Sequence, residues 1–371
     1  MRIGLVVSGG FDPSGRERVT PSLLWFVERL ARRHDVHVFV LHYYREPLDY
    51  PMLGAAVHDL GRVSGPPGFR RARQRQRLTE ALRARGPFDL LHAYQGMPAA
   101  VTTRPGRELG VPVVVTLDSG ELTAIDDIAY GLQRRWFDRR AVTSCVHGAA
   151  RVTVCTEFMA RMIPAGLTAA PIDVVPIGCD PACFPPAARA DGPPWRLVRV
   201  ASINPVKDYP TLLHAVAIVA GNGLDVHLDV VGEDTMNGRM QALARELSIE
   251  SRVTFNGFQP TEALARFYAR AHLHVVSSRH EAAGVVVLEA AATGLATVGT
   301  EVGYVADWMP DRAVALPVGD PQRLAGAIGD LLRDPATRER IAAAARTWTL
   351  AHDADWTAAQ FERIYVAAGR S

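Results

Sequence analysis

Short apolar runs rich in β-branched residues alternate with helical segments along the first half of the chain. The run Arg2–Val7 predicts a buried strand, and apolar residues at helical spacing between Leu23 and Leu30 predict a helix that begins near Pro21. Further strands are predicted at Val36–Leu41, Leu90–His92, Val113–Leu117 and Arg151–Cys155. Strands separated by helices in this way are typical of a parallel, doubly wound sheet.

The same alternation begins again in the second half. Strands are predicted at Leu197–Ala201, Val226–Val231, Val253–Phe255, Leu273–Val276 and Ala296–Val298, with helices near Pro210–Ala220, Met236–Leu247 and Thr261–Ala271. Between the two series, the proline-rich residues 185–194 fit neither helix nor strand and predict a hinge. We therefore expect an α/β protein of two Rossmann-like, doubly wound domains facing a central cleft, with residues 1–186 in one domain and 187–352 in the other. Ligands should bind at the carboxyl ends of the strands.

Composition narrows the class of partner. The chain has 371 residues and a net charge of +2, which argues against nucleic acid. No apolar run approaches the roughly 18 residues that span a bilayer, and the apolar stretch near the N-terminus is too short for the hydrophobic region of a secretory signal. We therefore expect a cytoplasmic protein. The four cysteines form no CxxC pair. We expect buried, reduced thiols, neither a disulfide framework nor a metal site.

Two features of the cationic residues stand out. Arginines gather at residues 70–77, where either contact with a membrane surface or a solvated helix start is possible. The second is favoured because Arg71 and Arg75 would point away from Arg73 and Arg77 on a helix, although peripheral membrane contact stays open. Lys207 is the only lysine among 41 cationic residues. Either its position is due to chance, or it has a role that needs a compact ammonium and not a planar guanidinium.

The segment 277–294 is the strongest candidate for chemistry, because it follows a predicted strand and begins a helix. Gly284 lacks a Cβ, so a ligand can approach the backbone, and the N–H groups of Val285 and Val286 can receive a diphosphate. A carboxylate at Glu289 suits the hydroxyls of a ribose, and Glu281 in the preceding loop suits a sugar hydroxyl. The alternative is two ordinary carboxylates favoured by the helix dipole.

These residues resemble the glutamate-X7-glutamate signature of family four, the retaining nucleotide-sugar glycosyltransferases with the two-domain GT-B architecture. Five further segments resemble that family's motifs in the same order: Pro176–Asp180, Val200–Asp208, Val230–Gly232, Phe255–Phe258 and Val302–Gly303. Near the end, Asp355, Trp356 and Tyr365 are similar to the terminal helix, here 353–371, that in this family returns to the first domain.

The resemblance implies roles for particular residues. The first domain would bind the acceptor and the second the donor, with Glu281 at the donor sugar, Lys207 at the diphosphate, and Gly257 and Phe258 along the nucleobase. It also places at the donor site Ser202, Gly232, Gly284, Val285, Val286 and Glu289. A loop of the first domain would approach the donor, unless it is merely a turn: Gly9, Gly10, Gly15 and Arg16.

The chain departs from the family pattern at two positions. Ser202 stands where the family has an arginine five residues before the lysine, so Arg16 or Arg279 would have to supply that charge. Asp118 replaces a histidine that follows the fifth strand in many members. It could orient an acceptor hydroxyl, but it donates a hydrogen bond only when protonated. His92, at another strand end, is either a structural histidine or an acceptor contact.

The resemblance implies a retaining hexosyltransferase that takes its sugar from a nucleoside diphosphate sugar, with uridine or guanosine expected as the nucleoside. The acceptor would be a hydroxyl of a glycan, a lipid or a small molecule. No cofactor and no metal are expected beside the donor. Two alternatives remain: an epimerase or phosphorylase of the same architecture, and a non-catalytic protein that binds nucleotide sugars. The second is suggested by the departures from the family pattern at Ser202 and Asp118.

Overall fold

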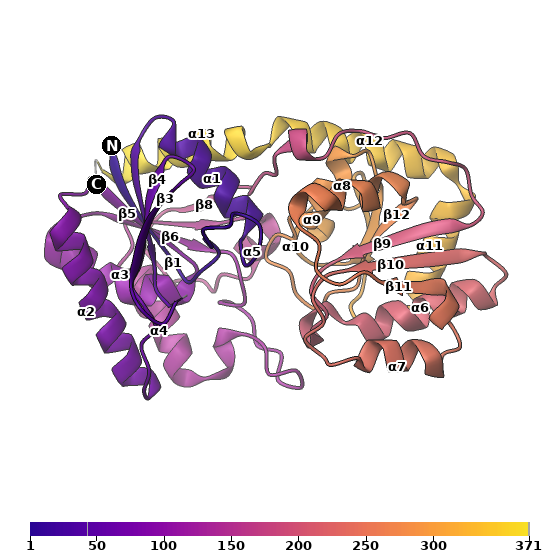
Figure 1. Ribbon diagram of the computed structural model, residues 1–371, viewed down its shortest axis with the longest axis horizontal. Helices are drawn as coiled ribbons and strands as arrows, with labels where there is room; N and C mark the ends of the chain where they lie inside the picture. The colour runs from indigo at the N-terminus through magenta and orange to yellow at the C-terminus, as the bar shows by residue number, and fades with distance from the viewer. Residues whose placement is uncertain (43, 370–371) are drawn as a thin grey trace. The chain divides into compact units, whose positions relative to one another are not determined.

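The computed structural model describes residues 1–42 and 44–369, which form two compact units (Figure 1). The first unit contains Met1–Ile177 and the segment from Ala354 onward, and the second contains Gly178–Asp353. The sequence placed the first boundary at 186/187, so residues 178–186 belong to the other unit. Their attachment explains the difference: Phe184 is fully buried and its ring lies 6.0 Å from that of Tyr268 in the second unit.

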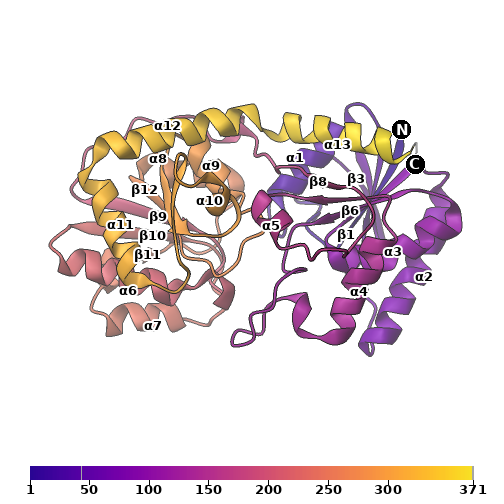
Figure 2. The same ribbon diagram turned by 180° about the vertical axis from the view of Figure 1, so that it is seen from behind.

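The first unit is built on an eight-stranded sheet of order β3-β4-β2-β1-β5-β6-β7-β8, in which only the edge strand β3 is antiparallel to its neighbour. Its strands are β1 (Arg2–Val7), β2 (Asp35–Val40), β3 (Leu48–Met52), β4 (Ala55–Asp59), β5 (Leu90–Tyr94), β6 (Val113–Leu117), β7 (Arg151–Val154) and β8 (Ile172–Val174). Its helices are α1 (Pro21–Ala31), α2 (Pro67–Arg85), α3 (Gly96–Leu109), α4 (Trp136–His147), α5 (Glu157–Arg161) and α13 (Ala354–Ala368), with a short 3-10 helix η1 (Leu132–Arg134). Helices α1 and α13 lie on one side of the sheet and α2, α3 and α4 on the other (Figures 1 and 2).

The terminal helix α13 belongs to the first unit, where it packs against α1. The predicted helix extended to residue 371, and its last two residues lie outside the described part of the chain. His92, on β5, is fully buried and contacts this helix. Its Nδ1 lies 2.7 Å from the hydroxyl of Tyr365 on α13, and its Nε2 lies 2.6 Å from Thr116 Oγ1. Burial lowers the pKa of His92 to about 3, so its imidazole is neutral. Of the two interpretations of His92, the structural one is confirmed.

Replacing Tyr365 by phenylalanine should destabilise the first unit measurably. The substitution keeps the ring but leaves Nδ1 of the buried His92 without its partner, which costs about 1–3 kcal/mol in the free energy of unfolding. Urea denaturation of the full chain, followed by circular dichroism, measures the change. A loss below about 0.5 kcal/mol, the usual range for surface substitutions, would show that this contact does not hold α13 in place.

The second unit is built on a six-stranded, fully parallel sheet of order β11-β10-β9-β12-β13-β14. Its strands are β9 (Trp195–Val200), β10 (Val226–Val231), β11 (Val253–Phe255), β12 (Leu273–Val276), β13 (Thr297–Thr300) and β14 (Ala313–Leu316). Its helices are α6 (Tyr209–Gly221), α7 (Arg239–Glu246), α8 (Thr261–Arg270), α9 (Val286–Ala292), α10 (Gly303–Trp308), α11 (Pro321–Arg333) and α12 (Pro335–Ala351), with 3-10 helices η2 (Pro181–Cys183), η3 (Pro205–Lys207) and η4 (Glu250–Arg252). Aliphatic side chains of the central strands pack against α6, α7 and α11 to form one continuous core.

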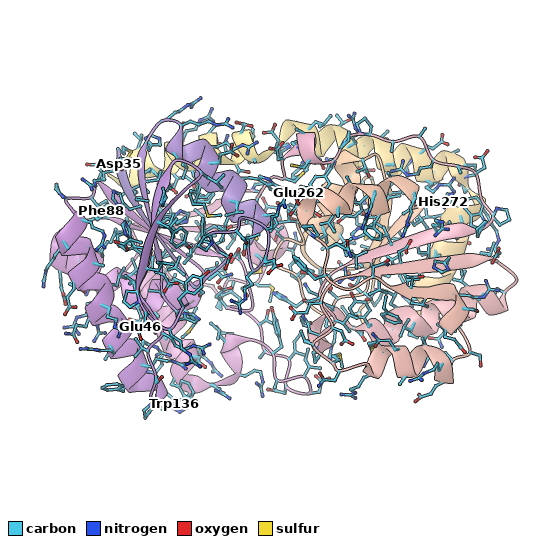
Figure 3. The ribbon with its side chains drawn as sticks, viewed as in Figure 1. Asp35, Glu46, Phe88, Trp136, Glu262 and His272 are labelled. Atoms are coloured by element: carbon cyan, nitrogen blue, oxygen red, sulfur yellow. The ribbon has the colours of Figure 1, made fainter. Side chains whose placement is uncertain are left out.

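The proline-rich segment 185–194 is irregular, as predicted, but it does not act as a free hinge. The Arg189 guanidinium donates hydrogen bonds to the carbonyl oxygens of Ala271, Thr293 and Gly294 at 2.8–3.0 Å. His272, labelled in Figure 3, donates from Nε2 to the Ala190 carbonyl oxygen at 2.8 Å. Because these partners are all in the second unit, the segment is fixed to that unit, and the hinge interpretation is wrong.

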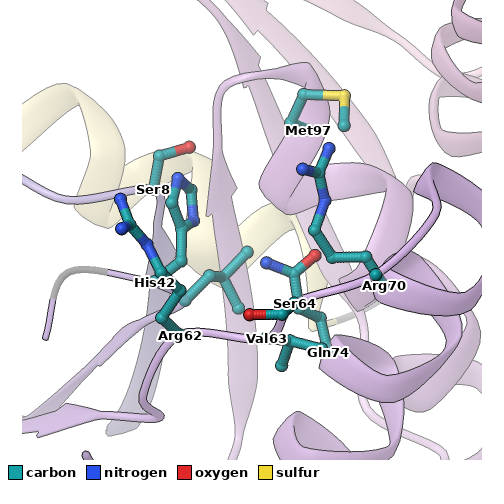
Figure 4. Close-up of a pocket in the computed structure, with 10 residues that line it drawn as sticks. Ser8, His42, Arg62, Val63, Ser64, Arg70, Gln74 and Met97 are labelled. Atoms are coloured by element: carbon teal, nitrogen blue, oxygen red, sulfur yellow. The ribbon is translucent and has the colours of Figure 1, made fainter. Parts of the chain in front are cut away.

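The arginines of α2 do not form a uniformly solvated surface. Arg71 Nη2 lies 3.2 Å from Asp138 Oδ1, and Arg77 Nη1 donates to the Leu60 carbonyl oxygen at 2.8 Å. Arg70 instead lines a cavity (Figure 4). Each arginine therefore has its own environment. Three of the four cysteines, Cys145, Cys155 and Cys179, are buried as predicted, whereas Cys183 is half-buried.

Candidate functional site

The carboxyl edge of the second sheet gathers most of the residues predicted to bind the donor. Ser202 follows β9, Gly232 follows β10, Gly257 follows β11 and Glu281 follows β12. Gly303 follows β13 and begins α10. Because parallel strands all end at the same edge of a sheet, the fold brings these loops together although they span 100 residues of sequence.

Lys207 and Glu281 form an ion pair at this edge. Lys207 ends η3, whose first turn is capped by the side chain of Asn204. Its Nζ donates to both carboxylate oxygens of Glu281 at 2.7 Å. Although burial opposes ionisation, the charges of Lys207 and Arg199 lower the pKa of Glu281 to about 2. Glu281 is therefore ionised throughout the physiological range.

Arg199 is a third charged residue of this cluster, and it was not predicted from the sequence. The side chain is fully buried, Nη2 donates to Ser278 Oγ at 2.6 Å, and Nη2 lies 3.7 Å from Glu281 Oε1. Within the described residues, Nε and Nη1 of Arg199 have no hydrogen-bond partner. Two cations thus face one carboxylate, and buried donors are left over. Such an excess favours an anionic ligand, because unpaired buried donors are costly.

Glu289 differs from Glu281 in its environment. It is 4% exposed on α9 and accepts a hydrogen bond from the Tyr268 hydroxyl at 2.8 Å through Oε2. Burial raises the pKa of Glu289 to about 7, and the hydrogen bond from Tyr268 offsets only part of this rise. The two glutamates of the signature therefore hold different protonation states near neutral pH. Glu281 is a fixed anion, whereas Glu289 is poised to release a proton.

The loop between β12 and α9 presents backbone donors. Gly284 has φ +80°, a conformation that glycine adopts without strain, and its carbonyl oxygen accepts from the Val287 N–H at 2.9 Å. Within residues 1–42 and 44–369, the N–H groups of Val285 and Val286 have no protein acceptor. Both donors are therefore available to a ligand, as the sequence analysis required.

Two further glycines are needed for close packing at the same edge. A Cβ on Gly232, whose φ is +154°, would lie 2.0 Å from the carbonyl oxygen of Ala201 at the end of β9. A Cβ on Gly303 would lie 2.4 Å from the Ala283 carbonyl oxygen. Gly257 instead has open space around it, and the neighbouring Phe258 ring is 52% exposed. An exposed aromatic ring at this edge offers a surface on which a planar group can stack.

Comparison with known proteins identifies the family. The pattern described as "Glycosyl transferase 4-like domain" matches residues 19–178, and that described as "Glycosyl transferases group 1" matches residues 185–348. The chain is 31% identical to the D-inositol 3-phosphate glycosyltransferase of Mycolicibacterium gilvum over 74% of this chain and 66% of that protein. It is 30% identical to the protein of the same name from Nocardia farcinica over 78% of this chain and 72% of that protein. The chain belongs to the group 1 glycosyltransferases of family four type.

The fold of this chain is that of GT-B proteins. Sucrose-phosphate synthase from Thermosynechococcus elongatus is similar over 99% of this chain and 98% of that one, with a TM-score of 0.84 and 21% identity. The Anabaena protein HepE, solved in complex with UDP-glucose, is similar over 99% and 100%, with a TM-score of 0.74 and 16% identity. The predicted fold class is confirmed. The chain spans about two thirds of the length of the first of its curated relatives.

The first unit carries a second polar cluster around Asp118, directly after β6. The neighbouring Glu121 is buried and accepts hydrogen bonds from the N–H groups of Gly96 and Ser119 at 2.9 and 2.7 Å. Burial, together with the charge of Glu121, raises the pKa of Asp118. This shift favours the protonated carboxyl, which can donate a hydrogen bond, and the predicted role of Asp118 toward an acceptor stays a prediction.

The N-terminal loop of the chain is a defined turn. Gly10 has φ +88°, and its carbonyl oxygen accepts from the Thr20 N–H at 3.1 Å. Gly15 has φ +65° and donates from its N–H to the Asp12 carbonyl oxygen at 2.9 Å. The turn geometry accounts for these glycines without a ligand. The predicted role of Gly9, Gly10, Gly15 and Arg16 toward the donor stays a prediction.

The described residues offer no group of three or more histidine, cysteine or acidic side chains that could hold a metal ion. Among the helices of the same residues, none is both long and apolar enough to cross a membrane.

Proposed function

We propose that the chain is a retaining glycosyltransferase that moves a hexose from a nucleoside diphosphate sugar to a hydroxyl acceptor. The observation that supports it most directly is the charge cluster at the carboxyl edge of the second sheet. There, Lys207 and Arg199 share one carboxylate, and the backbone donors of Val285 and Val286 are open. Two cations and free amides suit a diphosphate.

Each residue of this edge has a role in donor binding. Lys207 neutralises the diphosphate, and Glu281 accepts a hydrogen bond from a hydroxyl of the hexose. Glu289 accepts hydrogen bonds from the ribose, and the exposed ring of Phe258 stacks against the nucleobase. Arg199, three residues before Ser202, supplies the positive charge that the family's arginine would bring at the position of Ser202. Uridine and guanosine diphosphate sugars are the expected donors, and HepE, a structural neighbour, was solved with UDP-glucose.

The chemistry rests on stabilising the departing diphosphate. The bond between the anomeric carbon and the diphosphate oxygen breaks, while the acceptor oxygen attaches to the same face of the sugar. The acceptor proton passes to the leaving diphosphate. Lys207 and the amides of Val285 and Val286 hold the negative charge as it develops, which lowers the barrier without a metal. Lys207 and Arg199 hold Glu281 as an ion in the free protein, and Glu281 positions the sugar and does not attack it.

A transfer assay distinguishes this activity from the alternatives. The full chain is incubated with UDP-glucose or GDP-mannose, with and without D-inositol 3-phosphate and other polyols, in the presence of EDTA. Release of the nucleoside diphosphate only when acceptor is present supports transfer, and the NMR coupling of the product's anomeric proton reports retention. Calorimetric binding of donor with no turnover on any acceptor would instead indicate a non-catalytic binding protein. Product formation without an acceptor, or loss of activity in EDTA, would contradict the mechanism.

The raised pKa of Glu289 predicts that donor affinity increases with pH. Ribose hydroxyls donate to the ionised carboxylate, so the donor binds the deprotonated form and releases a proton. With a pKa of about 7, the association constant for UDP-glucose should rise about tenfold between pH 6 and pH 8. Titration calorimetry in two buffers of different ionisation enthalpy measures both the affinity and the released proton.

The matched control for this pH dependence is Glu289→Gln. Glutamine still accepts one hydrogen bond from the ribose but cannot ionise. UDP-glucose should bind this variant more weakly than it binds the parent at pH 8, and with little change between pH 6 and pH 8. If the variant kept the parent's pH profile, another group would be responsible.

A further inference from the structure

The hydroxyl of Tyr268 holds one oxygen of the Glu289 carboxylate. Tyr268 lies near the end of α8 and Glu289 in the first turn of α9, two helices that lie side by side (Figures 1 and 2). The hydroxyl donates to Oε2 at 2.8 Å. Among residues 1–42 and 44–369, the second carboxylate oxygen, Oε1, accepts no hydrogen bond. One oxygen of Glu289 is thus fixed by the protein, and the other is left for a hydroxyl of a ligand.

Aromatic neighbours fix the ring of Tyr268. The side chain is fully buried. The ring of Phe184 lies at a centroid distance of 6.0 Å with an interplanar angle of 73°, and that of His274 on β12 lies at 6.0 Å and 82°. Both pairs have the edge-to-face geometry that aromatic rings prefer. Because a close-packed ring cannot tilt without displacing these neighbours, packing sets the position of the hydroxyl.

The surroundings of Glu289 settle which group donates. Burial, reinforced by the charge of Glu289, raises the pKa of Tyr268 well above its usual value, and the opposing charge of Arg199 is a smaller effect, so the phenol stays protonated. Burial, also reinforced by Glu289, raises the pKa of the Cys179 thiol, which is therefore neutral. Helix α12 and strand β13 pack against α9 as well. From α12, Arg346 donates to the carbonyl oxygen of the last residue of α9, and β13 carries no charged residue.

We propose that Tyr268 is a positioning residue for the nucleoside diphosphate sugar: its hydroxyl fixes Oε2 of Glu289, leaves Oε1 to accept from a ribose hydroxyl, and favours the charged carboxylate. The inference rests on the proposed function, because it assigns a role within the donor site of that transferase. Tyr268 acts through Glu289. A hydrogen bond donated to a carboxylate stabilises the charged form more than the neutral form. Glu289 is therefore charged, and ready for the ribose, at a lower pH than burial alone would allow.

Tyr268→Phe should move the pH dependence of donor binding upward. Without the hydroxyl, the charged form of Glu289 loses more stabilisation than the neutral form, so the midpoint of its titration should rise by about one pH unit. The donor binds the charged form. Calorimetry with UDP-glucose should therefore give binding about fivefold weaker than in the parent at pH 7, but less than about twofold weaker at pH 9. A loss by the same factor at both pH values would show a packing role only and overturn the proposal.

Tyr209→Phe is the matched control. Tyr209 is fully buried in the same unit, and its hydroxyl donates to the Ala201 carbonyl oxygen at 2.7 Å. This variant also loses a buried hydrogen bond from a tyrosine, but the lost partner is not Glu289. The midpoint of the pH dependence should stay at the parent value even if the affinity changes. An upward shift of the same size in Tyr209→Phe would attribute the effect to lost packing and contradict the role of Tyr268.

A double variant tests whether Tyr268 acts through Glu289. In a chain that already carries Glu289→Gln, adding Tyr268→Phe should change the affinity for UDP-glucose at pH 7 by less than about twofold, because no ionising group remains for the hydroxyl to act on. The affinity should also stay independent of pH. If the double variant lost a further fivefold or so, Tyr268 would act on the donor by another route, and the proposal would be wrong.

Titration of the free chain separates this inference from the proposed function. In protein isotopically labelled at the glutamate carboxyl carbons, the NMR signal of Glu289 is identified by its loss in Glu289→Gln. It should titrate about one pH unit higher in Tyr268→Phe than in the parent. An unchanged midpoint would overturn the role of Tyr268 alone. If the midpoint shifts while the parent's affinity for UDP-glucose does not depend on pH, the ribose does not lie at Glu289, and the donor site of the proposed function fails together with the positioning role.

Discussion

Lys207→Met should lower kcat/KM for sugar transfer by about 10²–10³, the loss expected when one preorganised charge at a developing anion is removed. The Lys207 ammonium is the only lysine of the chain, and it lies at the carboxyl edge beside Glu281 and the open amides of the α9 loop. UDP affinity should fall as well, by about 10–100-fold, because a charged hydrogen bond to the diphosphate is lost. Transfer assays and calorimetry with UDP measure the two effects.

Lys207→Arg is the matched control for charge. If the position needs only a cation, this variant restores both activities. We expect partial recovery, because a planar guanidinium cannot occupy the place of a compact ammonium that donates to both oxygens of Glu281. Transfer by Lys207→Met within about threefold of the parent would remove Lys207 from the diphosphate site, since a lost charge contact costs more than that factor.

Strands were the best predicted part of the fold. Arg2–Val7, Val113–Leu117, Val226–Val231 and Leu273–Val276 were predicted with the bounds that the structure has. These central strands are buried on both faces, so their sequences are continuous apolar runs. The strands that were missed, β3, β4, β8 and β14, lie at or next to sheet edges. Polar residues interrupt the apolar pattern in β3 and β8, whereas β14 is a run of only four apolar residues.

The predictions that were wrong depended on contacts far apart in the sequence. Arg189 lies in a segment whose composition is that of a hinge, and only the positions of Thr293 and Gly294, more than 100 residues away, show that it is anchored. The cavity lined by Arg70 was missed for the same reason, since its walls come from the ends of several strands of the first sheet. Local composition does not carry such information.

The candidate site was predicted in part. Ser202, Gly232, Gly257 and Glu281 could be placed at one edge because each follows a predicted strand and the strands of such a sheet run parallel. Arg199 was not found, because an arginine within the apolar run of β9 gives no sign of its partner on the loop after β12. One signal could have indicated Arg199. Ser202 stands where the family has an arginine, and a replacement for that missing charge could have been sought on the preceding strand, where Arg199 lies.

Glu281→Gln should strongly reduce transfer while strengthening the binding of UDP. In the free protein, both carboxylate oxygens of Glu281 accept hydrogen bonds from the Lys207 ammonium, and Oε1 also lies 3.7 Å from Arg199 Nη2. Glutamine keeps the size of the side chain but removes the charge that competes with the diphosphate. Removing one repulsion of about 1 kcal/mol tightens UDP binding about fivefold. Transfer should fall about 10²–10³-fold, because the amide no longer positions the hexose as the carboxylate does.

The two measurements must move in opposite directions for this argument to hold. Glu246→Gln, which removes an exposed carboxylate from α7 of the same unit, controls for the change in net charge and should leave both unchanged. Thermal unfolding of both variants excludes a loss of folded protein. If Glu281→Gln weakened UDP binding and transfer by the same factor, Glu281 would only organise the diphosphate site. Opposite changes are expected only of a residue that competes for Lys207 in the free protein and positions the sugar once the diphosphate has taken its place.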